Sequence, residues 1–414
     1  MATEAKEQRR LFTPFIIRML LVLFFVEFVK GALIVTILPV YMNIVLGLSA
    51  YTVGWTLALQ YAGDNLFRTP MGYVIDRIGY RIGILGGVAV AGVSVWIMAY
   101  GKSSGWMLLA ATLLGIGTSP LWPSVIAGAT AEAGEQARGK VMSVVYVAWL
   151  SGTGLGPVVI NLLIRGNDYL PTFWFLLGLL AFVLAIALFL PDHAAKGGPG
   201  RHEYALRTKS DSPLLQRASV YIRNVLSSIH VSPLFYPALF LQNIAIGLLA
   251  PVLTLYAKEI LHLSNVMYSL LLIFGGGITI LLLYPVGLLV DRWGTRWLLH
   301  IGFLLSSAAI VFFTSARSMP LLLGTSGLIG VSYALIIPAW NAYIAALVPE
   351  DKRAFVWGFF LTIEGGGMVA GSILSGRLWD TFGPQAPFFV SGGVMVVIFV
   401  LHLFISNKQP VMVR

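Results

Sequence analysis

The chain has 414 residues, of which 58% are apolar and 11% are charged, and it contains no cysteine. A typical soluble domain has about 25% charged residues, whereas the mean hydropathy here is +0.86, so most of the chain is expected to face lipid. Without cysteine, disulfide bonds and thiolate metal sites are excluded. The formal net charge of +10 indicates binding either to a nucleic acid or to a membrane surface, and the distribution of the lysines and arginines along the chain decides between them.

Apolar segments long enough to cross a bilayer as helices recur along the whole chain. About 20 apolar residues span the hydrocarbon core of a membrane. The sequence therefore predicts an all-α membrane protein with twelve transmembrane helices. These spans lie near residues 12–38, 51–74, 82–101, 106–129, 140–164, 170–190, 233–257, 267–290, 297–315, 319–345, 355–379 and 385–406.

The longest polar interruption divides the twelve spans into two sets of six. We expect an N-terminal six-helix bundle over residues 1–192, a cytoplasmic linker over 193–232 and a C-terminal six-helix bundle over 233–414. Within the linker, apolar residues from Leu214 to Ile229 recur on one helical face. That pattern is typical of an amphipathic helix that lies on the membrane surface, and a plain connector is the alternative.

The basic residues are distributed unequally between the two sides of the predicted membrane. If both termini are cytoplasmic, the cytoplasmic segments hold nineteen of the 27 lysines and arginines, the opposite side holds five, and three fall within spans. The positive-inside rule then places both termini and the linker in the cytoplasm. Topology and anionic lipids explain the net charge, so no nucleic-acid partner is expected.

An internal repeat relates the two halves at a constant offset of 215 residues. The segment from Gly72 to Arg81 (GYVIDRIGYR) recurs as the segment from Gly287 to Arg296 (GLLVDRWGTR). Six spans is an even number, so the two halves have the same orientation in the membrane. Parallel repeats of this kind are typical of transporters that rock two halves around a central site.

These repeated loops resemble the signature of the major facilitator superfamily, and with twelve spans and a central linker the resemblance covers the whole chain. It implies two pseudo-symmetric six-helix bundles and a cytoplasmic latch that holds the outward-facing state. Ordinary topogenic charge with tight-turn glycines is the alternative. The residues that the resemblance assigns to the latch and its repeat are Gly72, Asp76, Arg77, Gly79, Arg81, Arg138, Asp291, Arg292, Arg296 and Arg353.

Four charged residues of the first half lie at mid-membrane, where the repeat places neutral residues in the second half. Glu27 and Lys30 are three residues apart and Asp64 and Arg68 are four apart, so each pair shares a helix face. An unpaired charge at this depth costs at least about 2.5–3.5 kcal/mol. Two carboxylates facing one cavity would bind and release a proton as access alternates. A static salt-bridge network between the first two spans is the alternative.

Several other residues inside spans are candidates for contact with a substrate. Trp122 and Trp149 lie away from the membrane interfaces where tryptophan concentrates, and an indole face suits a sugar or a glycerol group. Glu364 is charged where the corresponding residue of the first half, Trp149, is neutral. It is either a second protonation or substrate site or a capped structural residue. The remaining candidates are Trp340 and the uncharged polar residues Gln242, Asn243 and Asn341.

Several segments of the chain also resemble the lipoteichoic-acid anchor-glycolipid flippases, which are proton-coupled antiporters of a disaccharide-diacylglycerol. The segments that carry this resemblance are Glu27 to Lys30, Asp64, Ser119 to Trp122, Arg138 to Trp149 and Leu335 to Asn341. The resemblance implies that Glu27, Lys30 and Asp64 serve the proton and the headgroup. It also implies that Trp122 and Trp149 stack on the sugar. Residue 30 is a lysine where the resemblance leads us to expect an arginine. The lysine ammonium is a point charge, whereas an arginine guanidinium binds two oxygen atoms at once.

The sequence thus predicts a proton-coupled, alternating-access antiporter that flips a glycolipid across a bacterial cell membrane. A proton-coupled exporter of drugs or other lipophilic compounds is the close alternative, and a non-transporting scaffold or sensor is the second. An enzyme is not expected, because no nucleophile–base or metal constellation occurs at membrane depth. We expect no cofactor beyond the proton gradient as energy source. The expected partners are protons, membrane lipids and an amphipathic substrate, and the protein is expected to be a monomer.

Overall fold

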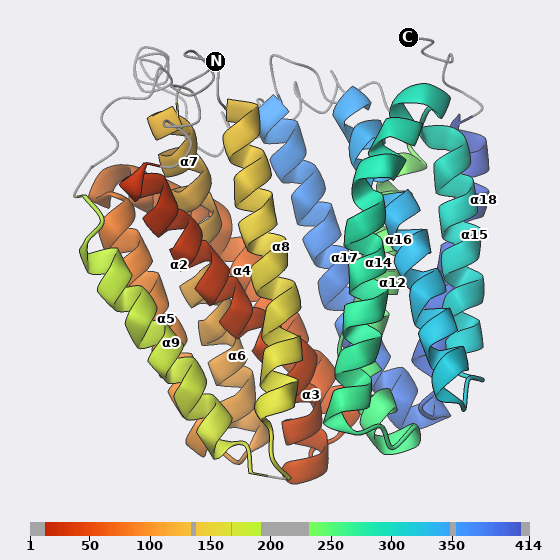
Figure 1. Cartoon of the computed structure of the whole chain (residues 1–414), viewed down its shortest axis with the longest axis horizontal. Helices are drawn as coiled ribbons and strands as arrows, with labels where there is room; N and C mark the ends of the chain where they lie inside the picture. Colours follow the sequence, from red (N-terminus) through yellow and green to blue (C-terminus); the bar gives the residue numbers. More distant parts are fainter. Residues whose placement is uncertain (1–12, 134–137, 167, 192–231, 348–352, 407–414) are drawn as a thin grey trace, which may run out of the picture. The chain divides into compact units, whose positions relative to one another are not determined.

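The computed structural model describes residues 13–133, 138–166, 168–191, 232–347 and 353–406, and the elements named in these ranges are all helices (Figure 1). Eleven helical stretches of this described chain are long and apolar enough to cross a membrane. The predicted class, an all-α multi-pass membrane protein, is therefore confirmed. The predicted surface helix between Leu214 and Ile229 lies outside the described residues.

The predicted span at 51–74 forms a helix but does not meet the hydropathy of the other eleven. Helix α4 (Ala50–Ile78) has 29 residues, enough to cross the hydrocarbon core at 1.5 Å per residue. Gln60, Asp64 and Asn65 lower its mean hydropathy around the middle of the span. The polar residues that lower the hydropathy of α4 thus lie in the segment that contains the predicted site residues Asp64 and Arg68.

The first half folds as predicted, with two local differences. The span predicted at 12–38 continues to Val45 through two π-helical turns, and the span at 106–129 is broken at Ser119–Pro120, because Pro120 has no amide hydrogen for the helix ladder. The helices are α2 (Pro14–Gly31), η1 (Ala32–Ile37), α3 (Leu38–Val40), η2 (Tyr41–Val45), α4, α5 (Tyr80–Tyr100), α6 (Ser104–Thr118), α7 (Leu121–Ala133), α8 (Arg138–Leu163) and α9 (Leu170–Leu188).

The second half reproduces these elements at the offset of 215 residues that the sequence repeat predicts. Helices α4 and α14 correspond residue for residue, as do α3 with α13 and η2 with η4. The helices are α12 (Phe235–Leu249), α13 (Leu253–Leu255), η4 (Tyr256–Ile260), α14 (Asn265–Trp293), α15 (Thr295–Phe313), α16 (Met319–Leu347), α17 (Arg353–Phe382) and α18 (Ala386–Ser406).

The repeat extends to the backbone of its turns. Gly79 and Gly294 join α4 to α5 and α14 to α15 with φ angles of 87° and 75°, a region that glycine enters without steric cost. Gly47 (φ 67°) corresponds to His262, which adopts φ 50°. A non-glycine residue in this conformation is uncommon, and the inherited geometry of the turn accounts for it.

Contacts divide the chain into two compact units. Unit 1 comprises 1–195, 249–270 and 372–384, and unit 2 comprises 196–248, 271–371 and 385–414. Two short segments of the second half therefore belong to unit 1. The predicted domain limits at 192 and 233 border the undescribed stretch and stay a prediction.

Hydrogen bonds attach these two segments to the rest of unit 1. The Asp380 carboxylate accepts from the amide N–H groups of Ala50 (3.2 Å) and Tyr51 (2.8 Å), at the first turn of α4. An acidic side chain at this position satisfies orphan amides and complements the helix dipole. The Asn161 side chain donates to the Asn265 carbonyl (2.6 Å) and to the Ser269 hydroxyl (2.8 Å).

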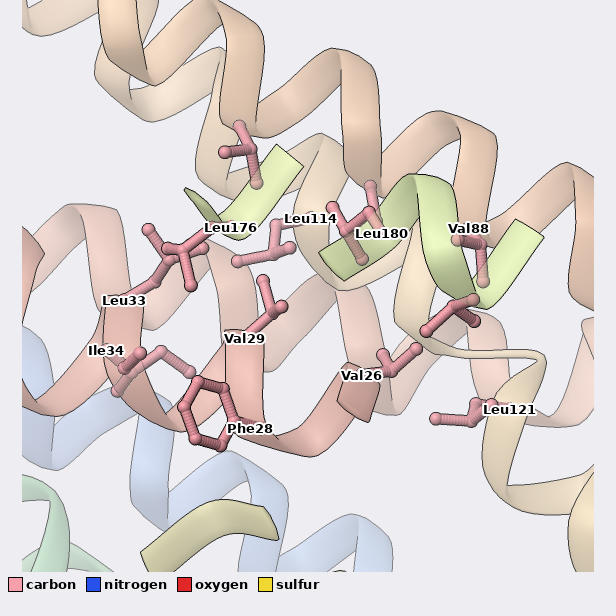
Figure 2. Packing of buried hydrophobic residues seen from close by; sticks show 14 of the residues in the cluster. Val26, Phe28, Val29, Leu33, Ile34, Val88, Leu114, Leu121, Leu176 and Leu180 are labelled. Carbon is pink, nitrogen blue, oxygen red and sulfur yellow. The ribbon is translucent and has the colours of Figure 1, made fainter. Parts of the chain in front are cut away.

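The core of unit 1 consists of aliphatic and aromatic side chains from helices that surround α2. Figure 2 shows side chains of α2, η1, α5, α6, α7 and α9 converging on one cluster, among them Val29, Leu33, Leu114 and Leu180. Because lipid tails are as apolar as these side chains, close packing rather than removal from water holds such helices together. The core of unit 2 is built in the same way around Phe235, Leu299, Phe303 and Phe360.

Candidate functional site

The four mid-membrane charges of the first half form one connected cluster inside unit 1. Lys30 Nζ lies 3.0 Å from Glu27 Oε1 and 3.1 Å from Asp64 Oδ2. Arg68 Nη2 lies 3.3 Å from Asp64 Oδ1. The two pairs that the spacing predicts within α2 and α4 are present, and the Lys30–Asp64 contact between the two helices joins them into a chain.

The two carboxylates of the cluster are buried, its two cations are half-buried, and its formal charges balance. Glu27 is 5% exposed and Asp64 is 6% exposed. With Lys30 and Arg68, the cluster contains two carboxylates and two cations. A buried charge is tolerated only when its partners replace water, so each residue depends on the next one in the chain. Adding a proton to either carboxylate would leave the cluster with an excess positive charge.

Glu27 has a second partner that the sequence reasoning did not identify. The Thr153 hydroxyl on α8 donates to Glu27 Oε2 over 3.3 Å. A threonine among the small residues of an apolar helix carries no distinctive sequence signal. Its role follows only from the way α8 lies against α2.

Glycines let the backbones of α2 and α8 approach closely beside Glu27. A Cβ atom added at Gly152 would lie 2.4 Å from the Phe24 carbonyl oxygen and 3.2 Å from Glu27 Cβ. A Cβ atom at Gly156 would lie 2.2 Å from the Phe28 carbonyl oxygen. The glycine-rich segment of α8 from Gly152 to Gly156 is therefore a helix-crossing segment.

A similar close approach brings α6 against α4 at Asp64. A Cβ atom at Gly115 would lie 2.2 Å from the Gln60 carbonyl oxygen and 2.8 Å from the Asp64 amide nitrogen. Gln60, one turn before Asp64, is buried, and neither polar atom of its side-chain amide has a partner among the described residues. The sequence reasoning also missed Gln60, although its position four residues before Asp64 is a usable signal.

Three aromatic side chains form a cluster on α7 and α8. The ring centroid of Trp122 lies 5.7 Å from that of Tyr146 and 5.8 Å from that of Trp149, and Tyr146 and Trp149 are 6.2 Å apart. Both tryptophans are half-buried and Tyr146 is exposed. Trp149 is one helical turn before Thr153, so α8 contributes both to the aromatic cluster and to the surroundings of Glu27. Tyr146 was not predicted as a site residue.

The candidates of the second half lie in unit 2 and occupy different environments. Trp340 is buried in the core, where it stacks on Phe235 with ring centroids 6.0 Å apart. Asn341 is exposed, Glu364 is half-buried, and the Asn243 side chain donates to a backbone carbonyl of its own helix. Gln242 is buried, and its Oε1 has no hydrogen-bond partner in the described part of the chain. Their roles in substrate binding stay predictions.

The described side chains cover only part of the predicted latch. The Arg77 guanidinium donates to the Tyr73 hydroxyl and lies 4.4 Å from the centroid of the same ring. Gly79 and Gly294 make the left-handed turns described above. The side chains of Asp76, Arg138 and Arg353 lie outside the described part of the structure, so the latch stays a prediction. The other latch residues are Gly72 and Arg81, which are half-buried, and Asp291, Arg292 and Arg296, which are exposed.

Unit 2 contains a cavity of about 350 Å³ between α14 and α16. Its lining is mainly apolar and includes one charged residue, Asp291. Leu283, at the position that corresponds to Arg68 in the repeat, is among the lining residues. The two halves therefore differ in chemistry at equivalent positions.

The helical fold and the internal repeat are those of a known transporter family. The model of the Major Facilitator Superfamily matches residues 19–241 and 235–413, which is nearly the whole chain. The chain belongs to the Major Facilitator Superfamily. The prediction of this family from the sequence is confirmed, and the protein is a multi-pass membrane transporter.

Curated relatives within the Major Facilitator Superfamily include proteins named proton-coupled antiporter flippase LtaA. The protein from Staphylococcus saprophyticus is 26% identical over 371 residues, which cover 87% of this chain and 86% of that protein. The protein from Staphylococcus aureus strain USA300 is 26% identical over 405 residues, which cover 95% of this chain and 96% of that protein. The names of these relatives agree with the resemblance to proton-coupled antiporter flippases that the sequence predicts.

Solved structures of the Major Facilitator Superfamily share the fold. The nucleoside transporter NupG has a TM-score of 0.73 at 13% identity, and the match covers 96% of this chain and 100% of that one. A POT family transporter in complex with 5-aminolevulinic acid has a TM-score of 0.74 at 15% identity, and the match covers 95% of this chain and 96% of that one. These relatives are transporters rather than enzymes.

Proposed function

We propose that this protein exchanges protons for a glycolipid of the disaccharide-diacylglycerol type, moving the lipid from one leaflet of the membrane to the other. The observation that carries the proposal is the buried chain of charges from Glu27 through Lys30 and Asp64 to Arg68. Ionisable residues at membrane depth are costly and mark ion or substrate pathways. The names of the LtaA relatives support the same function.

Within the cluster, Glu27 is the carboxylate best suited to accept the proton. Asp64 has two cationic partners, whereas Glu27 has one cation and the neutral Thr153 hydroxyl among the described residues. Protonation of Glu27 therefore weakens one ion pair, whereas protonation of Asp64 weakens two. When Glu27 is neutral, Lys30 is left with Asp64 as its single anionic partner in the cluster. A protonated Glu27 also no longer offers an ionised carboxylate to a hydroxyl group of the substrate, so proton and substrate compete for this side chain, as exchange requires.

The aromatic cluster supports a sugar headgroup as the polar part of the substrate. Trp122, Tyr146 and Trp149 contact one another edge to face, and Trp149 lies one helical turn before Thr153, the partner of Glu27. An aromatic face packs against the apolar face of a sugar, while the indole N–H offers a hydrogen-bond donor. A neutral, hydroxyl-rich headgroup also suits Lys30, whose three donors bind single oxygen atoms rather than a planar anion.

The cavity of unit 2 supports an apolar second part of the substrate. Its mainly apolar lining between α14 and α16 is suited to a hydrocarbon chain rather than to a free sugar. A soluble sugar would need polar partners there, so the lining favours a substrate with an apolar part.

The location and energy source form part of the same proposal. With nineteen of 27 basic residues on one side, both termini and the linker face the cytoplasm of a bacterial cell. The proton gradient across the cell membrane drives the exchange, and no cofactor is needed for it. The protein acts as a monomer, with protons, membrane lipids and the substrate as its partners.

The test is lipid flipping in vesicles with an imposed proton gradient. Purified protein is reconstituted, and transfer of a fluorescent diglucosyl-diacylglycerol between leaflets is measured with the gradient present and collapsed. We expect gradient-dependent flipping by the wild type and its loss in Glu27→Gln and Asp64→Asn. Glu132→Gln is the matched control, because it removes an exposed carboxylate at the end of α7 and should retain the wild-type rate.

Other outcomes of this experiment correspond to the alternatives. Proton movement driven by a lipophilic drug without lipid flipping would assign the protein to drug efflux. Failure to move any of these compounds, with a correctly folded and oriented protein, would favour a scaffold or sensor. Gradient-independent flipping that is unaffected by Glu27→Gln would separate lipid transport from proton coupling and contradict the proposal.

A further inference from the structure

The two segments of the second half that belong to unit 1 lie at one end of the helices. Residues 249–270 and 372–384 are at the ends opposite to the chain termini, which the positive-inside rule predicts to be the outer ends. There the carboxyl end of α17 contacts the start of α4, and the carboxyl end of α8 contacts the start of α14. In each contact the two helices come from different halves of the chain.

The start of α4 takes part of its cap from the other half. The first amides of a helix have no partner inside that helix. The Ser49 hydroxyl, directly before α4, accepts from the Thr52 amide over 3.2 Å. The Ala50 and Tyr51 amides donate instead to the two carboxylate oxygens of Asp380, over 3.2 and 2.8 Å. If α17 moves away from α4, these two hydrogen bonds break.

Asp380 is poorly placed for its own helix. It lies in the last turn of α17, a turn that contains no basic residue. An anion at the carboxyl end of a helix is disfavoured by the helix dipole, whereas the same charge at the start of a helix is favoured. The contact with α4 therefore provides a favourable interaction that α17 does not offer to this carboxylate.

Glycines allow the backbones of α4 and α17 to approach closely next to Asp380. A Cβ atom at Gly376, one turn before Asp380, would lie 2.2 Å from the Ala50 carbonyl oxygen. A Cβ atom at Gly54 would lie 2.3 Å from the Ser372 carbonyl oxygen. The contact is thus a close helix crossing as well as a pair of hydrogen bonds, and separation of α4 from α17 disrupts both.

The equivalent contact between α8 and α14 is made by neutral groups. Asn161 corresponds to Gly376 in the repeat, and its side chain donates to the Asn265 carbonyl (2.6 Å) and to the Ser269 hydroxyl (2.8 Å). Arg165, which corresponds to Asp380, lies beyond the end of α8 and is exposed. The hydrogen bonds between the halves are therefore neutral at α14 and charge-assisted at α4.

We propose that Asp380 is a charge-dependent lock on the outer ends of the two halves. While its carboxylate caps α4, the outer ends of α4 and α17 stay together, and opening toward the outer side breaks both hydrogen bonds. The strength of this cap then sets the share of molecules that are open on the outer side. Because α4 also carries Asp64 and Arg68, the lock acts on a helix of the charged cluster. The inference goes beyond the proposed function, since it requires neither glycolipid transport nor protonation of Glu27.

The test is a distance measurement between the outer ends of the two halves. The chain contains no cysteine, so Ser103→Cys and Ser318→Cys introduce two unique positions for spin labels. These serines are exposed, occupy equivalent positions of the repeat and precede α6 and α16 at the outer end. Double electron–electron resonance in lipid nanodiscs, without substrate and at constant pH, measures the ratio of long to short distances. This ratio reports open against closed outer ends.

Three variants separate the lock from a general effect of surface charge. Asp380→Ala should raise the ratio of open to closed outer ends by about 2- to 30-fold, the range expected for the loss of a helix cap. Asp380→Asn retains one acceptor oxygen and should raise the ratio by a smaller factor. Asp168→Ala is the matched control, because the exposed Asp168 caps α9 of its own half through the Leu170 amide (3.1 Å). It should leave the ratio unchanged.

A second pair of labels distinguishes opening from local fraying of α4. Ile82 and Trp297 are exposed, equivalent positions near the inner ends of α5 and α15, and labels there should approach each other when the outer ends separate. The proposal is overturned if Asp380→Ala leaves the outer distances unchanged, if Asp168→Ala changes them equally, or if the inner distances do not respond. Should Asp380→Ala fail to fold, Asp380→Asn is judged by the same criteria. Neither lipid nor proton gradient enters the measurement, so its result is independent of the flipping assay.

Discussion

The Lys30 ammonium and the Asp64 carboxylate lie 3.1 Å apart and connect α2 to α4 inside the membrane-spanning part of unit 1. Lys30 also holds Glu27 at 3.0 Å, so one cation serves two carboxylates on different helices. A proton that binds to either carboxylate therefore changes a contact between helices as well as a local charge. This relationship is the physical basis for coupling proton binding to helix movement.

Lys30→Met should destabilise the protein and Lys30→Arg should not. Methionine leaves two buried carboxylates without their shared cation, and breaking a buried pair in this way costs about 3–5 kcal/mol. Arginine restores a cation that can reach both carboxylates. Thermal unfolding in detergent measures the difference. The deficit of Lys30→Met should shrink as the pH is lowered, because a protonated Glu27 needs no cation; a deficit independent of pH would contradict the assignment.

Thr153→Val should slow proton-coupled transport without unfolding the protein. Valine has nearly the shape of threonine but lacks the hydroxyl that donates to Glu27 over 3.3 Å. One lost hydrogen bond to a charged group corresponds to about 1.5–3 kcal/mol. Transport rates at several pH values, with unfolding temperature as the folding check, measure the effect. Thr153→Ser keeps the hydroxyl and should behave like the wild type, and equal losses in both variants would argue against this hydrogen bond.

The sequence was sufficient for the fold and for the charged residues, but not for the contacts between them. Hydropathy predicts the spans, and the repeat predicts corresponding helices such as α4 and α14, because both depend on local pattern. The spacing of Glu27 and Lys30 predicts their pair for the same reason. The Lys30–Asp64 and Thr153–Glu27 contacts depend on how helices cross, which no local pattern in α2 or α8 determines.

Gly156→Ala should destabilise the protein more than Gly154→Ala. The new methyl group at Gly156 would meet the Phe28 carbonyl oxygen at 2.2 Å, whereas the one at Gly154 would meet no described atom within 4 Å. Overpacking at a helix crossing costs about 1–3 kcal/mol. The matched pair differs only in position on α8. Similar unfolding temperatures for the two variants would show that α2 and α8 do not approach as closely as described.

Trp149→Ala should weaken binding of a sugar headgroup while leaving proton binding intact. An aromatic contact of this kind contributes about 0.5–1.5 kcal/mol, which corresponds to a rise of about 2- to 13-fold in the half-saturating lipid concentration. Lipid titration in the flipping assay measures this rise. Trp96→Ala on α5 removes an exposed tryptophan that contacts Tyr100 and should have no effect.

Four buried polar rings of unit 2, those of His300, Trp340, Tyr343 and His402, show a second limit of prediction from sequence. His300 and His402 are 102 residues apart and each lies alone in an apolar helix, so no spacing relates them. Trp340 was predicted from the sequence as a substrate contact, yet it packs in the core beside Tyr343. Only the packing of α15 against α16 and α18 brings the four rings together.

Proton movement driven by a lipid gradient tests the central claim most directly. Vesicles containing the protein and an internal pH-sensitive dye receive the diglucosyl lipid on one side, with no proton gradient imposed. For the wild type we predict that protons cross the membrane in the direction opposite to the lipid, and that the internal pH changes accordingly. In Glu27→Gln we predict no pH change, although lipid binding is retained. A pH change of wild-type size in Glu27→Gln would contradict the account, because the proton would then travel by a route that does not include the carboxylate chain.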